Sequence, residues 1–158
     1  MVSQLLAELK QTKPFVTPES EAAVSISRTA ALVEHTIGEM LRVHRVTQTQ
    51  YNVLRILRGA GPAGMCRNDV RDRLVARVPD ATRLLDRMAE MGLVTRDRDT
   101  PDRRVVSTRI TQRGLDLLER IDQPMKELHA KQFGHLGPKK LAQLIDLLAE
   151  VRRAEMFQ

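Results

Sequence analysis

Residues 96–111, RDRDTPDRRVVSTRIT, place five arginines and three aspartates within sixteen positions. A guanidinium donates two parallel N–H bonds to a phosphate or to a guanine edge, and a nearby carboxylate can fix its direction. The Thr100-Pro101 step between the charged residues is typical of a turn, and alternating polar and apolar residues follow it. The segment therefore predicts a β-hairpin whose tip carries phosphate-binding arginines held in place by aspartates.

The positive charge of the chain is concentrated around this hairpin. Residues 46–111 contain thirteen arginines, no lysine and eight acidic residues, and so carry +5 of the formal net charge of +6. Arginine suits bidentate contact with phosphates and guanine edges, whereas lysine acts as a flexible point charge. The pattern favours a polyanionic partner, and a solvated basic face is the alternative.

The composition disfavours several classes of protein. No apolar run approaches the roughly 18 residues that cross a bilayer, and no secretory signal is visible, so we expect a cytoplasmic protein without a membrane partner. The single Cys66 excludes an intramolecular disulfide. The sequence has no nucleophile elbow, phosphate-cradling glycine loop or HExxH motif, so we expect neither an enzyme nor a cofactor.

Helical patterns precede the hairpin. The Thr17-Pro18 pair predicts a helix start, and apolar residues recur at helical spacing to about residue 45. Thr47 and Gln50 form a capping-box pattern at the start of a second helix, which ends at the GAGPAG segment. Residues 65–75 predict a third, shorter helix.

A fourth helix leads into the hairpin. It is predicted from Pro79 to the closing Gly92, with arginines on its polar face. Together with the short helix before it, this element predicts a helix-turn-helix. Strands at 93–97 and 103–111 follow at once, so the whole segment predicts a winged helix-turn-helix.

Two further helices follow the hairpin. Thr111 is the expected cap of a long helix kinked by Pro124, and a last helix is predicted from Pro138 to about Met156. The predicted fold class is mainly α with a small β-wing, in which long N- and C-terminal dimerisation helices flank the winged helix-turn-helix.

The flanking helices carry more apolar surface than a 66-residue winged helix needs for its own core. We therefore expect a homodimer with N-terminal dimerisation helices at 1–45, a DNA-binding region at 46–111 and C-terminal dimerisation helices at 112–158. A two-fold dimer places two recognition helices one DNA turn apart and reads a palindromic operator in double-stranded DNA. A monomeric helical domain is the alternative.

The DNA contacts are predicted from the positions of the polar side chains. The first two turns of the helix from Pro79 are expected to read base edges, and the wing arginines to enter the minor groove or hold its phosphates. An arginine that only solubilises its face is the alternative for any single position. The predicted DNA-binding residues are Asp80, Thr82, Arg83, Arg87, Arg73, Arg77, Arg98, Arg103 and Arg104, with Asp99 and Asp102 as wing-positioning residues.

These motifs resemble the MarR family of bacterial transcription regulators over nearly the whole chain. The resemblance is carried by PDATRLLDRMAEMGLVTR, by the wing pattern Asp99-x-x-Asp102-Arg103-Arg104, and by Ile110-Thr111 and Gly114 after it. The family often has leucine where Ile110 stands, which is a conservative difference. The resemblance implies a dimeric winged-helix DNA-binding protein, usually a repressor that a small ligand or oxidation releases.

The resemblance also implies a small amphipathic or aromatic effector bound between the dimer helices and the winged helix. The lining candidates are Arg42, His44, Arg45 and Tyr51, in which an arginine receives a carboxylate and the tyrosine supplies a polar-tipped wall. The alternative is a core role for Tyr51 and solvated arginines.

Three other functions stay open at this point. They are a ligand-independent architectural DNA-binding protein, a redox-sensing regulator that uses Cys66, and a module that binds a protein partner through its helices. We expect no metal site, because the hairpin aspartates lack the glycine and glutamate of a calcium loop and the four histidines lack zinc-ligand spacing.

Overall fold

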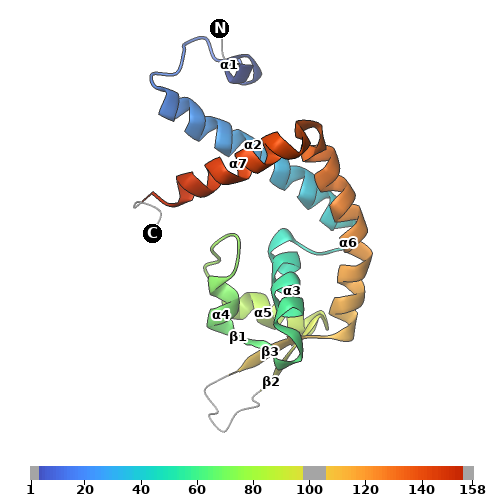
Figure 1. Cartoon of the computed structure of the whole chain (residues 1–158). Coiled ribbons are helices and arrows are strands. Elements are labelled where there is room, and N and C mark those ends of the chain that lie inside the picture. Colours follow the sequence, from blue (N-terminus) through green and yellow to red (C-terminus); the bar gives the residue numbers. More distant parts are fainter. Residues whose placement is uncertain (1–3, 98–105, 155–158) are drawn as a thin grey trace. The chain divides into compact units, whose positions relative to one another are not determined.

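The computed structural model describes residues 4–97 and 106–154. The chain is mainly helical with one small antiparallel sheet, as the sequence predicts (Figure 1). It divides into two compact units, residues 1–39 and residues 40–158, and the predicted winged helix-turn-helix lies in the second.

The first unit holds α1 (Gln4–Glu8) and most of α2 (Pro18–Val43). The predicted start of α2 is confirmed, because the Thr17 hydroxyl accepts a hydrogen bond from the Ser20 N–H at 3.2 Å. The helix was expected to reach about residue 45 but ends at Val43, and Arg45 then adopts a positive φ of 58°. This left-handed residue turns the chain toward the next helix.

The predicted capping box opens α3 (Gln48–Ala60). The Gln50 N–H donates to the Thr47 hydroxyl at 3.2 Å, and the Thr47 N–H donates to the Gln50 side-chain oxygen at 2.9 Å. The helix ends at Ala60 with Gly61 as its cap, and the short 3-10 turn η1 (Gly61–Ala63) follows. Val53, Leu54 and Leu57 of α3 are fully buried.

The region after η1 differs from the helix predicted over 65–75. Met65–Cys66 forms strand β1, and α4 covers Arg67–Asp72. The predicted start was wrong because a two-residue strand depends on pairing with a distant segment, which periodicity does not reveal. The predicted end was wrong as well, since α4 stops at Asp72 and Arg73 caps it. The helix predicted from Pro79 is α5 (Ala81–Glu90), since Asp80 is its non-helical cap.

The three strands form a sheet in the order β1-β3-β2, with both pairs antiparallel. Strand β2 covers Val94–Asp97 and β3 covers Ser107–Ile110; residues 103–105 of the predicted second strand lie outside the described residues. Thr108 on the central strand is fully buried between Met65 and Arg96 of its neighbours. The sequence does not decide which side chains of this strand face inward, and in the structure the Thr108 side chain faces the core.

Thr108→Val is expected to stabilise the protein by about 1 kcal/mol. The buried Thr108 hydroxyl has no hydrogen-bond partner among the described residues, so its replacement by a methyl group removes an uncompensated desolvation cost. Chemical denaturation measures the change. The matched control is Thr95→Val on the exposed side of β2, which should lie within about 0.5 kcal/mol of wild type; a destabilised Thr108→Val would contradict the assignment.

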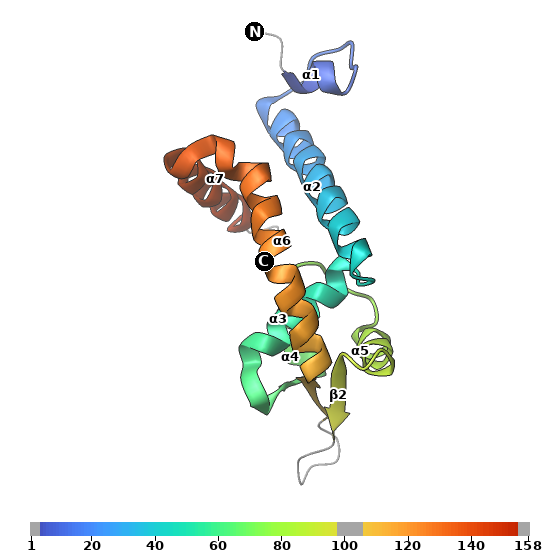
Figure 2. The ribbon, with the colours of Figure 1, turned by 90° about the vertical axis from the view of Figure 1, so that its right-hand side faces the viewer.

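Two helices follow the sheet, namely α6 (Gln112–Phe133) and α7 (Gly137–Arg152), joined by the 3-10 turn η2 (Gly134–Leu136). The predicted cap is confirmed, because the Thr111 hydroxyl accepts from the Gly114 N–H at 3.1 Å. Helix α6 contains Pro124 and packs against α3 (Figure 2). The fully buried core of this unit is built from Leu41, Val53, Leu54, Leu57, Leu85, Met88, Leu118 and Ile121.

Within residues 4–97 and 106–154, no helix has the length and apolar character that a membrane span requires.

Candidate nucleic-acid interface

Helix α5 is fixed at both ends. The Asp80 carboxylate accepts a hydrogen bond from the Arg83 N–H at 2.9 Å, which caps the first turn. At the other end Gly92 adopts a φ of +71°, and its N–H and that of Leu93 donate to the carbonyls of Ala89 and Met88. These bonds form a Schellman motif, so α5 begins and ends at defined residues.

One face of α5 is buried and anchors the helix. Ala81, Leu85 and Met88 pack into the core, and the last two are fully buried. The i, i+4 and i+7 spacing places these side chains on one stripe. The polar side chains of α5 therefore lie on known faces of a helix that cannot rotate without losing its core contacts.

A second ridge of α5 is held by arginines from two other elements. Thr82 and Asp86 lie one turn apart on this ridge. Arg67 of α4 donates to the Thr82 hydroxyl at 2.9 Å, and Arg96 of β2 forms an ion pair with Asp86. These roles of Arg67 and Arg96 cannot be predicted from local sequence, because the pairs join residues 15 and 10 positions apart in different elements.

The neighbouring ridge carries the two arginines that the sequence predicts as DNA ligands. Arg83 and Arg87 are one turn apart and exposed, and no hydrogen bond or ion pair engages their side chains among the described residues. Because Asp86 is paired with Arg96, its negative charge beside them is largely neutralised. The ridge thus presents two positive side chains on a fixed helix.

The other predicted contacts of α5 have additional roles. Asp80, predicted to accept from a cytosine amino group, uses one carboxylate oxygen as the helix cap. Thr82, predicted to reach a base edge, is half-buried and accepts from Arg67. Each still has bonding capacity for DNA, since a carboxylate has a second oxygen and a hydroxyl has a proton.

Arg73 and Arg77, the predicted phosphate contacts, lie in the connection between α4 and α5. Both are exposed. This connection is tied to α3 where the Val75 N–H donates to the Asn52 side-chain oxygen at 2.9 Å. Asn52 is a residue that sequence reasoning missed, and no local signal would have revealed it.

The base of the wing is held by charge pairs. Arg109 of β3 lies 3.4 Å from the carboxylate of Asp97 on β2 and donates to the Pro62 carbonyl at 3.0 Å. Arg96 and Arg109 therefore have structural partners within the protein. The wing residues predicted to contact DNA or to position that contact, Arg98, Asp99, Asp102, Arg103 and Arg104, lie outside the described residues.

A further charge pair joins the winged helix to the C-terminal helices. Arg58 of α3 donates both terminal nitrogens to the Asp122 carboxylate of α6, at 2.6 and 3.0 Å. The hydrogen bonds from Arg58 hold the pKa of Asp122 below its ordinary value, and the carboxylate raises the pKa of Arg58. Asp122 lies two residues before Pro124, and this half-exposed pair links α3 to α6.

The predicted effector residues lie close together in the chain at the junction of α2 and α3. Arg42 is in the last turn of α2, and His44 and Arg45 lie in the connection formed by residues 44–47. Tyr51 is half-buried on α3, and its ring and hydroxyl contact the guanidinium of Arg55, with 3.4 Å between Arg55 Nη1 and the hydroxyl. Tyr51 thus has a cationic neighbour that was not predicted.

Cys66 has a structural contact at the start of α4. The Cys66 sulfur accepts from the Asp69 N–H at 3.5 Å, so it caps α4. Among the described residues, no three histidine, cysteine or acidic side chains are grouped in a way that would hold a metal ion.

Comparison with known proteins finds relatives that share this fold. Residues 46–106 match the family model described as the MarR family. The crystal structure of a MarR transcription factor from Planctomyces limnophilus is 37% identical, and the match covers 86% of this chain and 98% of that one, with a TM-score of 0.67.

Two other relatives extend the comparison. An uncharacterised HTH-type transcriptional regulator of Bacillus subtilis, YkoM, is 29% identical over 85% of this chain and 88% of its own length. BpsR of Bordetella bronchiseptica, whose DNA binding is regulated by 6-hydroxynicotinic acid, is 20% identical, with a TM-score of 0.78 and coverage of 90% of this chain and 100% of that one. The likeness to BpsR concerns the fold.

Proposed function

This chain belongs to the MarR family of transcription regulators, and from that premise we propose that it is a homodimeric repressor of a palindromic operator. In this proposal a small aromatic or amphipathic acid releases the protein from DNA. We propose that residues 1–45 and 112–158 form the dimer and that residues 46–111 bind DNA.

The observation that carries the proposal is the exposed Arg83 and Arg87 ridge on a helix fixed at both ends. Sequence-specific reading requires side chains held at a defined depth and angle in the major groove. The two end caps, the buried Leu85 and the pair between Arg96 and Asp86 supply that rigidity.

The proposed dimer is supported by the apolar surface of α7. None of its side chains is fully buried in the described chain, although the helix is rich in leucine, isoleucine and valine. Ile145, Leu147 and Val151 are 57%, 61% and 44% exposed. Leu147 and Val151 are one turn apart, and Ile145 lies on another face of α7. Exposed apolar side chains of this kind mark an interface, and a second copy of the chain is the occupant that a two-fold operator reader needs.

Ile145→Glu is expected to weaken dimerisation at least tenfold, because burying an unpaired carboxylate in an apolar interface is costly. Light scattering at micromolar concentration measures the mass, which should fall from twice 17.9 kDa toward 17.9 kDa. Gln143→Glu introduces the same charge at an exposed polar position of α7 and should remain dimeric. A dimeric Ile145→Glu variant would place the interface elsewhere.

The proposed effector site is the α2–α3 junction. Arg42 and Arg45 would receive the carboxylate of an aromatic acid, His44 would add a further polar contact, and Tyr51 would stack against the ring. The support is the proximity of these residues in the chain and the example of BpsR, which responds to an aromatic acid.

Selection from random duplex DNA tests the proposed function. A recovered palindrome with half-sites about one helical turn apart would support a dimeric operator reader. Aromatic carboxylates, with 6-hydroxynicotinic acid as the first probe, should then lower the affinity for that palindrome and raise the melting temperature. Equal recovery of all sequences would favour the architectural role, and recovery of none would favour a protein-binding module.

A further inference from the structure

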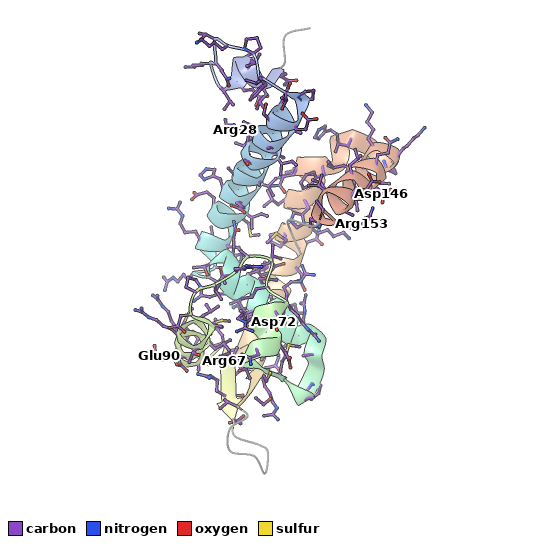
Figure 3. The ribbon with its side chains drawn as sticks, turned by 90° about the vertical axis from the view of Figure 1, so that its left-hand side faces the viewer. Arg28, Arg67, Asp72, Glu90, Asp146 and Arg153 are labelled. Atoms are coloured by element: carbon purple, nitrogen blue, oxygen red, sulfur yellow. The ribbon has the colours of Figure 1, made fainter. Side chains whose placement is uncertain are left out.

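Arg67 and Thr82 form a contact between the two helices of the helix-turn-helix. Arg67 is the first residue of α4, and its Nη1 atom donates to the Thr82 hydroxyl oxygen at 2.9 Å. Figure 3 marks Arg67 and Asp72, which are the two ends of α4, and Glu90, which is the last residue of α5. Thr82 is the second residue of α5, so the contact lies at the end of the helix where base reading is proposed.

The contact determines which hydrogen-bonding role Thr82 can offer. A hydroxyl has one proton and two lone pairs, whereas a guanidinium has donors and no acceptor. Arg67 must therefore occupy one of the two lone pairs of the Thr82 oxygen, and the hydroxyl proton is directed to another acceptor. The positive guanidinium beside the second lone pair disfavours the approach of a further donor, such as an amino group. Donation by Arg67 also polarises the hydroxyl and makes it a better donor.

The hydroxyl proton of Thr82 lacks the acceptor that is available to a threonine in the middle of a helix. The Thr36 hydroxyl of α2 donates to the carbonyls of Leu32 and Val33, at 3.2 and 2.9 Å. The corresponding carbonyls for Thr82 belong to Val78 and Pro79, which precede α5, and the described residues show no bond from Thr82 to either. The Thr82 hydroxyl proton thus makes no hydrogen bond within the described part of the protein.

Arg67 itself is not neutralised by a carboxylate. Its second terminal nitrogen, Nη2, lies 3.4 Å from the side-chain oxygen of Asn68, and no ion pair involves Arg67 among the described residues. Arg71, one turn further along α4, is by contrast paired with Asp72 at 3.0 Å. The guanidinium beside Thr82 keeps its full positive charge.

We propose that Arg67 is a positioning residue that sets base specificity through Thr82. It holds the threonine hydroxyl as a donor, so that Thr82 selects a base-edge acceptor, such as N7 of a purine or O4 of thymine, against the amino group of cytosine. This inference rests on the proposed function. Specificity at one base pair would then depend on a residue outside the recognition helix.

The test is a set of binding measurements on the selected operator and on all its single-base variants. Arg67→Met should reduce the preference at one base pair of each half-site by about fivefold to tenfold, because one hydrogen bond loses its direction. Thr82→Val should reduce the same preference, and the Arg67→Met/Thr82→Val double variant should lose no more than either single change. Arg67→Lys keeps a donor and should retain the preference.

Arg71→Met is the matched control, because it removes the same charge from the same helix. It should leave the base preferences unchanged. If Arg67→Met weakens binding to every duplex equally, Arg67 is a phosphate contact and the inference is wrong. An unchanged preference in Arg67→Met would equally overturn it, whereas a wild-type protein without any base preference would overturn the proposed function itself.

Discussion

Arg83→Ala should bind the selected operator about tenfold to a hundredfold more weakly and should lose its preference at one base pair in each half-site. A well-placed arginine on a guanine edge contributes about 1–3 kcal/mol of discrimination against the wrong base. Arg83 is exposed, and its backbone is held by the Asp80 cap at 2.9 Å. Fluorescence anisotropy with the operator and its single-base variants measures both effects.

The control for Arg83→Ala is Arg120→Ala, which removes the same charge from an exposed position of α6. The control should preserve the base preferences. If Arg83→Ala weakens binding to all duplexes by the same factor, Arg83 contacts phosphate and base reading falls to another residue of α5. Unchanged affinity would remove α5 from the proposed interface.

Gly114→Ala should lower the free energy of unfolding by about 2–3 kcal/mol, although alanine is usually the better helix former. A β-carbon at Gly114 would lie 2.5 Å from the Leu93 carbonyl oxygen and 2.7 Å from Ile110. The Leu93 carbonyl cannot move freely, because it accepts a hydrogen bond from the Thr111 N–H at 3.1 Å. Chemical denaturation is the measurement.

Gly59→Ala is the matched control on α3. A β-carbon there has open space around it, so the change should stabilise the protein by up to about 1 kcal/mol. Opposite signs for the two glycines would show that the close packing of α6 against the strands, and not helix propensity, accounts for Gly114. A stable Gly114→Ala variant would mean that the Leu93 segment shifts without cost.

Much of the fold follows from local signals in the sequence. The caps at Thr17, Thr47 and Thr111 and the helix end at Gly92 were predicted, because each depends on residues within a few positions of one another. The start of α5 was placed at Pro79 and not at the Asp80 cap, since both residues are compatible with a helix start. Such boundaries are decided by backbone angles that the sequence does not show.

The long-range pairs could not be predicted from the sequence. Strand β1 has two residues and exists through its pairing with β3, and the bidentate pair between Arg58 and Asp122 joins positions 64 apart. Structural arginines could not be separated from the predicted DNA-binding ones by local pattern alone. The structure assigns Arg58, Arg96 and Arg109 to carboxylate partners and leaves Arg83 and Arg87 exposed.

The most direct test of the account is an anisotropy titration of wild-type protein with the selected operator and a scrambled duplex of equal length, each at about 50 and 200 mM salt. The account predicts that the operator binds roughly a thousandfold more tightly than the scrambled duplex at the same salt. It also predicts a steep loss of affinity with salt, of about 10³-fold or more if each dimer neutralises at least six phosphates. Equal affinity for the two duplexes, or affinity independent of salt, would contradict sequence-specific DNA binding by this protein.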